Sequence, residues 1–280
     1  MNQGTRVAFC TDFSHNAKVG LDNLLFSIWS FEVGVDIIHL IEDNEEESLQ
    51  NIKELRESLK HQEDHTGKIK ILIFKPDEKD KLLDQLNLDK YNGVTLGLTG
   101  NGQGKGLGSF VRWVYAEVKN DVGVFPSNRF EKIDNRVTIL LEKEHIDYLY
   151  LLRKYATYLQ FNYCKLTIIL KSSEPISDTE TEVYKNRIMK IIPGLSYDVR
   201  FIQEAECSLL FLSLMEENKP DLLFLFSDDY FFDFSLKFLE QSSIRNKFDA
   251  SLNRVFASPE KREQYKTFSE KADIMRLKEF

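Results

Sequence analysis

The residue pattern with the clearest chemical meaning is a cluster of glycines. Of the chain's thirteen glycines, six stand close together, at Gly97, Gly100, Gly102, Gly104, Gly106 and Gly108. Glycine adopts positive φ without strain and lets backbone N–H groups approach a ligand, although it raises the entropic cost of folding. Such a cluster is therefore typical of an anion-binding loop or of a flexible linker.

The segments on either side of the cluster favour the anion-binding loop. The apolar stretch Gly93–Leu98 predicts a short buried strand, and apolar residues recur at helical spacing over Ser109–Val118. A strand, a glycine loop and a helix in this order direct backbone donors and the positive end of the helix at a phosphate. The charge agrees, because Lys105 and Arg112 are present while no Asp or Glu occurs in Tyr91–Ala116.

Apolar runs alternate with longer amphipathic stretches along the whole chain. The expected strands are Arg6–Thr11, Val35–Ile41, Lys68–Phe74, Gly93–Leu98 and Val122–Phe125, followed by Arg136–Leu141, Lys165–Lys171, Tyr197–Ile202, Asp221–Phe226 and Arg254–Ala257. The two series begin 130 residues apart, at Arg6 and Arg136, which indicates a tandem duplication. Helical connections predict parallel βαβ units. The expected fold class is therefore α/β, with two tandem doubly wound five-stranded parallel sheets.

The loops after the first and fourth strands of each unit should meet. Ligands of a doubly wound sheet bind outside the carboxyl ends of the strands, where the winding reverses. With the strand order 3-2-1-4-5, the reversal places the loop at Thr11–Ser14 opposite the glycine cluster. Asp12 can accept hydrogen bonds from an adenine amino group or a ribose hydroxyl. Its alternative role is to share the capping of a helix that starts at Ser14 and reaches about Ser30.

Four of these segments resemble motifs of the universal stress proteins. Arg6–Ser14 is similar to the family's first strand, which usually ends Pro-Thr-Asp-Phe-Ser, and Val35–Glu42 is similar to its second strand. Leu96–Gly100 resembles Met-Gly-x-x-Gly, and Gly108-Ser109 resembles the Gly-Ser that starts the following helix. The resemblance implies an adenine nucleotide α-hydrolase-like fold in tandem form. It also implies that the fifth strands pair across a pseudo-twofold, so that the chain imitates a dimer.

The resemblance further implies that the first unit binds ATP, ADP or AMP, with or without Mg²⁺, and acts as a regulator in the stress response. The residues that would contact the nucleotide are Thr11, Asp12, Leu40, Leu96, Gly97, Gly100, Lys105, Gly108 and Ser109. Two features depart from the family pattern. Seven residues instead of nine separate Gly100 from Gly108, and Cys10 replaces the usual proline. The loop is therefore tighter than in the family.

The second unit lacks the residues of this site. Leu141–Glu144 stands where the first unit has Thr11–Ser14, and Ser227–Phe234 stands where it has the glycine cluster. Acidic and bulky aromatic residues disfavour a phosphate, so no nucleotide site is expected there. We expect Tyr230–Phe232 to occupy part of the vacated crevice or to form a contact surface.

Composition limits the partners and the compartment. A net charge of −8 argues against nucleic acid or an anionic membrane as the main partner. No apolar run approaches the length of a membrane span, and the N-terminus lacks the apolar core of a signal peptide. Three widely spaced cysteines, Cys10, Cys164 and Cys207, suit a reducing compartment, so a cytoplasmic protein is expected. The expected domains are 1–130 and 136–258, followed by a helical extension at 259–280.

Other chemistry has weaker support in the sequence. His61 and His65 have a spacing that can hold zinc on a helix, but a solvated helix end is favoured. No Ser/His/Asp or Cys/His arrangement is recognisable, and no general base is identified. The Ser-Gly-Gly-x-Asp-Ser and His-x-Gly-His signatures of related enzymes are absent from the sequence. Slow ATP hydrolysis is thus the most that the residues allow.

A second function remains open. The shortened glycine loop, the degenerate second unit and the added C-terminal helix favour a nucleotide-free interaction module. Its partner would be another protein or a second copy of the chain.

Overall fold

The computed structural model describes residues 6–28, 33–41, 44–59, 69–97, 109–125, 136–155, 164–203, 222–227 and 251–256. These residues form two compact units. The first contains the described residues up to 125 together with 251–254. The second contains those from 136 to 227 together with 255 and 256.

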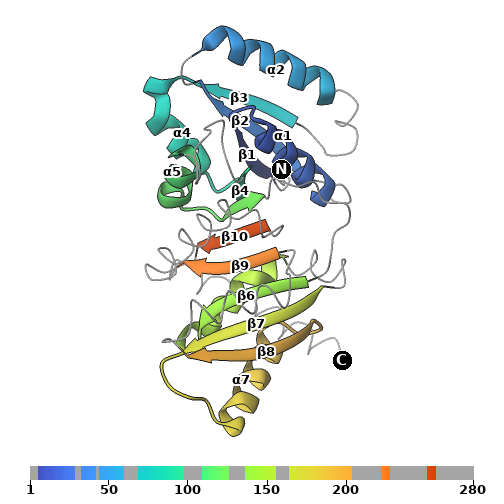
Figure 1. Ribbon diagram of the computed structural model, residues 1–280, viewed down its shortest axis with the longest axis vertical. Coiled ribbons are helices and arrows are strands. Elements are labelled where there is room, and N and C mark those ends of the chain that lie inside the picture. Colours follow the sequence, from blue (N-terminus) through green and yellow to red (C-terminus); the bar gives the residue numbers. More distant parts are fainter. Residues whose placement is uncertain are drawn as a thin grey trace, which may run out of the picture. The chain divides into compact units, whose positions relative to one another are not determined.

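The first unit is built on a sheet of five parallel strands (Figure 1). They are β1 (Arg6–Thr11), β2 (Gly34–Leu40), β3 (Ile69–Phe74), β4 (Tyr91–Gly97) and β5 (Val122–Phe125). Their order is β3-β2-β1-β4-β5, which confirms the predicted doubly wound sheet and its reversal between the first and fourth strands. Residues 252–254 of β10 (Ser251–Phe256) pair antiparallel with β5, as the resemblance implies for these edges.

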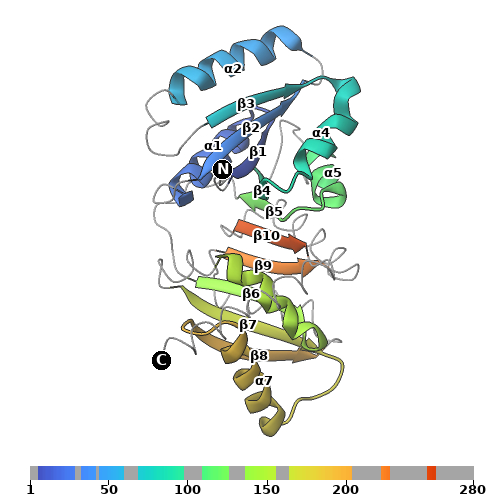
Figure 2. The ribbon, with the colours of Figure 1, turned by 180° about the vertical axis from the view of Figure 1, so that it is seen from behind.

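Helices cover both faces of this sheet (Figures 1 and 2). On one side lie α1 (His15–Ile28) and α2 (Glu45–Leu59). On the other lie α4 (Lys79–Leu86), which follows the short 3-10 helix η1 (Pro76–Glu78), and α5 (Ser109–Glu117). The apolar residues of α1 recur at helical spacing, so that one stripe is buried against the sheet. This stripe and the strand residues beneath it are Leu21, Leu24, Leu25, Phe9, Val35 and Ile37.

The segment between α5 and β5 is held by contacts with α4. Helix α5 ends at Glu117, next to the end of the predicted helical pattern at Val118. The side-chain amide of Asn120 donates to the backbone carbonyls of Leu86 and Leu88, at 2.8 and 3.1 Å. These bonds tie the segment to the end of α4.

The second unit has a sheet of four parallel strands. They are β6 (Arg136–Glu142), β7 (Lys165–Ser172), β8 (Ser196–Gln203) and β9 (Leu222–Ser227), in the order β8-β7-β6-β9. This order repeats the 3-2-1-4 of the first unit. The predicted fifth strand is present as β10, which stands next to β9 in the strand order and pairs antiparallel with β5.

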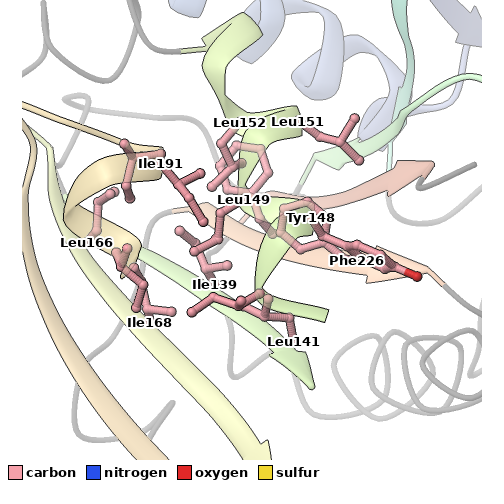
Figure 3. Packing of buried hydrophobic residues seen from close by; sticks show 14 of the residues in the cluster. Ile139, Leu141, Tyr148, Leu149, Leu151, Leu152, Leu166, Ile168, Ile191 and Phe226 are labelled. Atoms are coloured by element: carbon pink, nitrogen blue, oxygen red, sulfur yellow. The ribbon is translucent and has the colours of Figure 1, made fainter. Parts of the chain in front are cut away.

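One face of the second sheet is covered by η2 (Lys143–Tyr155), which is kinked at His145, and by α7 (Asp178–Ile191). Figure 3 shows the apolar core between these helices and the strands. No helix in the described part of the chain is both long and apolar enough to cross a membrane.

Candidate functional site

The turn that follows β1 is held by its own side chains. Thr11 Oγ1 accepts a hydrogen bond from the Phe13 N–H at 3.0 Å, and Asp12 Oδ1 accepts one from the Ser14 N–H at 2.9 Å. Ser14 Oγ accepts from the Ala17 N–H at 3.1 Å, which confirms Ser14 as the N-cap of α1. The alternative role of Asp12, a local capping residue, is therefore present in the structure. Its half-buried side chain is still reachable from solvent.

The end of β4 lies directly against the first turn of α1. A Cβ on Gly97 would lie 2.8 Å from the Asn16 carbonyl oxygen and 3.1 Å from the Ala17 Cα. A Cβ on Gly20, one helical turn after Asn16, would lie 3.2 Å from the Gly97 Cα. Because the obstructing atoms are backbone, close helix–strand packing requires Gly97 and leaves little room for a side chain at Gly20. That packing brings the start of the glycine cluster to the N-terminus of α1.

The structure places the described candidate residues at one edge of the first sheet. Thr11, Leu40 and Gly97 end the adjacent strands β1, β2 and β4. Thr11, Leu96 and Gly97 are buried, Asp12 and Leu40 are half-buried, and Ser109 is exposed as the first residue of α5. Gly100, Lys105 and Gly108 lie outside the described residues.

His39 belongs to the same edge and was not among the residues predicted to contact the nucleotide. The residue is buried, with 5% of its surface exposed. Nδ1 lies 2.8 Å from the Thr11 carbonyl oxygen and Nε2 lies 3.0 Å from Ser48 Oγ in α2. The Phe13 ring packs on the imidazole, with 4.5 Å between ring centroids. The sequence signal that could have drawn attention to His39 is its polar side chain within an otherwise apolar strand.

The opposite, amino-terminal edge of the sheet holds a buried ion cluster that the sequence reading missed. The Asp36 carboxylate is 1% exposed and forms an ion pair with Arg6. It also accepts hydrogen bonds from Lys90 Nζ at 3.1 Å and from the Tyr91 hydroxyl at 2.7 Å. A Cβ on Gly34 would overlap the Arg6 guanidinium, so this glycine leaves room for the pair.

These contacts set the acidity of Asp36. Burial alone raises the pKa of its carboxyl. Hydrogen bonds from Arg6, Tyr91 and Lys90, with the positive charge of Arg6, outweigh burial and hold the pKa below its ordinary value. The pKa of Tyr91 is raised by burial and by its bond to Asp36. The cluster ties β1, β2 and β4 together and is structural.

The carboxyl edge of the second unit carries an ion pair, between Lys171 and Glu142, in place of the capped turn. Lys171, at the end of β7, is only 4% exposed and its Nζ lies 3.3 Å from Glu142 Oε1. His145 Nδ1 lies 3.5 Å from the other oxygen of the same carboxylate. Glu142 occupies the position of Asp12 in the duplication. Its charge is therefore engaged with the ends of the second unit's own elements.

Aromatic rings fill the space above the second unit's strand ends (Figure 3). Phe226, near the end of β9, is fully buried. The Tyr148 ring of η2 lies 6.0 Å from the Phe226 ring and stacks on His145 at 4.8 Å. By strand register Phe226 corresponds to Gly97, since Leu140 pairs with Leu225 and Cys10 pairs with Leu96. The residues Tyr230–Phe232, expected to fill this space, lie outside the described residues.

Metal and thiol chemistry have no centre in the described part of the chain. No group of three or more His, Cys, Asp or Glu side chains is placed to hold a metal ion among these residues. His61 and His65 lie outside them. Cys10 and Cys164 are buried, and burial raises the pKa of the Cys10 thiol to about 12. Both are therefore unreactive core residues.

The doubly wound 3-2-1-4-5 sheet, followed by a second unit of the same winding, is the fold of the universal stress proteins in tandem form. A universal stress protein from Archaeoglobus fulgidus has this fold with a TM-score of 0.63 and 16% sequence identity. That similarity covers 91% of this chain and 97% of the other.

Two further solved structures have the same fold. A functionally unknown protein from Pseudomonas aeruginosa has a TM-score of 0.61 and 8% identity, over 95% of this chain and 97% of the other. The cytoplasmic domain of a prokaryotic cation chloride cotransporter has a TM-score of 0.54 and 13% identity, over 90% and 95%. No protein-family model matches the sequence, and the curated proteins contain no match to it.

Proposed function

We propose that the first unit binds an adenine nucleotide at the carboxyl ends of β1 and β4 and thereby serves a regulatory role of the universal-stress type. The observation that supports the proposal is that β1 and β4 lie side by side at the winding reversal. The turn containing Asp12 follows β1, and the glycine cluster begins at Gly97. Reversal points of this kind are where doubly wound sheets bind their ligands.

The residues at this edge fit an anionic ligand with a planar base. Leu40 offers a half-buried apolar side chain for the base, and Asp12 offers a carboxylate for an amino or hydroxyl group. Ser109 opens α5, whose first turn carries no acidic residue, so its N–H groups suit a phosphate. Any Mg²⁺ in the site would be bound together with the phosphates.

Calorimetric titration of the purified chain with ATP, ADP and AMP tests this function. We expect binding by the wild type and at least roughly tenfold weaker binding by Asp12→Ala, because a hydrogen bond to a charged group contributes about 1.5–3 kcal/mol. Asp12→Asn keeps an acceptor for the Ser14 N–H and separates loss of charge from loss of the turn. Glu142→Ala, at the matching position of the second unit, is the control and should leave the affinity unchanged. No binding at millimolar nucleotide would refute the proposal.

A nucleotide-free interaction module is the second candidate. The specific observation in its favour is the likeness to the cytoplasmic domain of a cotransporter, where the fold is part of a larger protein. The partner would be another protein or a second copy of this chain, in the cytoplasm. Light scattering across a concentration series, with and without ATP, would distinguish it: self-association that is indifferent to nucleotide favours the module.

A further inference from the structure

The imidazole of His39 connects two elements of the candidate site. In the strand register it lies opposite Thr11, the last residue of β1. One ring nitrogen contacts the backbone of the turn after β1 and the other contacts a side chain of α2, at 2.8 and 3.0 Å. The ring is buried, so both bonds form away from bulk water.

The chemistry of the partners fixes the tautomer. The Thr11 carbonyl oxygen can only accept, so Nδ1 carries the proton and donates it. In the neutral ring Nε2 then has only a lone pair, and it accepts the hydroxyl proton of Ser48. His39 is thus oriented by one bond to each element.

The turn that His39 contacts contains a strained residue. Phe13 has φ of 58°, in the left-handed region that non-glycine residues rarely adopt. Such conformations persist only where the surroundings determine them. Here Phe13 is held by the Thr11 side chain and by packing of its ring on His39. The strained residue lies directly between Asp12 and Ser14.

From these contacts we infer that His39 is a positioning residue for nucleotide binding. Through Nδ1 it holds the Thr11–Ser14 turn in the conformation that presents Asp12, while Nε2 anchors the ring to α2. This inference rests on the proposed function, because the ligand that Asp12 would meet is the nucleotide. A turn ordered before binding does not have to be ordered by the ligand, which increases affinity.

Two variants distinguish the contributions of the two ring nitrogens of His39. The amide of His39→Asn can reach the place of Nδ1 and donate to Thr11, whereas the longer His39→Gln can reach the place of Nε2 and Ser48. We expect His39→Asn to keep ATP affinity within about threefold and His39→Gln to weaken it roughly tenfold, which corresponds to about 1.4 kcal/mol. Ser48→Ala should behave like His39→Asn. A merely structural histidine would give equal losses of affinity in both His39 variants, and that result would overturn the inference.

Amide hydrogen exchange of the nucleotide-free protein provides an independent test. We expect the Phe13 and Ser14 amides to exchange about tenfold faster in His39→Gln than in His39→Asn, with β3 amides unchanged. If the wild type binds no nucleotide, the proposed function fails, but this difference would still support the holding of the turn by Nδ1. Equal exchange in the two variants would refute it.

Discussion

The two units end their central strands in different ways. In the first, β4 ends at Gly97 and α1 packs directly on its backbone. At the matching register position the second unit has Phe226, whose ring packs against Tyr148. Beside these residues, Thr11 and His39 of the first unit correspond to the buried Leu141 and Leu170. The first unit keeps its polar groups in place with a capped turn, whereas the second unit has buried apolar side chains at these three positions.

The amino-terminal edges differ as well. Asp36, which pairs with Ala8, is surrounded by Arg6, Lys90 and Tyr91. The corresponding residue in the second unit is the neutral Thr167, beside Thr138. The comparison shows that two sheets with the same strand order can carry very different side chains at both ends of their strands. At each end these side chains must either pack in the core or pair with a polar or charged partner.

The largest effect on stability is expected at Phe226, whose aromatic ring lies in the core of the second unit. Phe226→Ala should reduce the free energy of unfolding by about 3–5 kcal/mol, because it removes a fully buried ring and leaves a cavity. Urea denaturation followed by circular dichroism measures this. Phe26→Ala is the control, since Phe26 is 45% exposed and should cost far less. A loss below about 1 kcal/mol for Phe226→Ala would contradict the assignment of Phe226 as a core residue.

The next largest effect is expected at the ion cluster of the first unit. Asp36→Asn should destabilise by about 3–5 kcal/mol, because Arg6 and Lys90 would lose a buried carboxylate. Thr167→Val changes the matching neutral position and should have a much smaller effect in the same unfolding assay. Similar losses at the two positions would mean that the two amino-terminal edges do not differ as described.

The same carboxylate predicts a dependence on pH. The pKa of Asp36 is lowered in the folded protein from an ordinary 3.8, so its stabilisation is complete above that value. It is lost as the pH falls through the lower pKa of the folded state. The difference in unfolding free energy between wild type and Asp36→Asn should therefore narrow below about pH 4, in urea titrations from about pH 7 to about pH 2.5. A constant difference would show that the charge of Asp36 is not responsible.

A smaller effect is expected at the backbone contact of the first unit. Gly97→Ala should cost about 1–3 kcal/mol, because the added methyl group meets the backbone of α1. Gly93→Ala in the same strand is the matched control. Its Cβ would come no closer than 3.4 Å to the Asp121 carbonyl oxygen, an ordinary contact. Thermal unfolding of both variants tests whether Gly97 is needed for packing, and equal stability of the two would indicate that it is not.

The smallest effect on stability is expected at the serine helix caps, which both units have. Ser14 caps α1 and Ser177 caps α7, each by accepting a backbone N–H in the first turn. Ser14→Ala and Ser177→Ala should each cost about 1 kcal/mol. Unequal losses, measured by denaturant unfolding, would show that one helix start depends on other contacts.

The strands and their order could be predicted because their apolar runs are regular and the duplication repeats them. The Ser14 cap could also be predicted, because a serine directly before a helical pattern of apolar residues is a local signal for the start of a helix. The Asp36 cluster and the bonds of His39 could not, since both join residues on different elements and depend on register. The pairing of β10 with β5 could be predicted only through the resemblance to a known family, because it joins strands that lie far apart in the sequence. The residues of the glycine cluster beyond Gly97 remain a sequence-based prediction.

The difference between the two carboxyl edges is tested most directly by the stoichiometry of ATP binding. Calorimetric titration of the whole chain should give one ATP per chain, with binding reduced by Asp12→Ala and unchanged by Glu142→Ala. Two equivalents per chain, or equal losses in the two variants, would contradict the account that only the first unit binds nucleotide. The absence of any binding at millimolar ATP would contradict the nucleotide site itself.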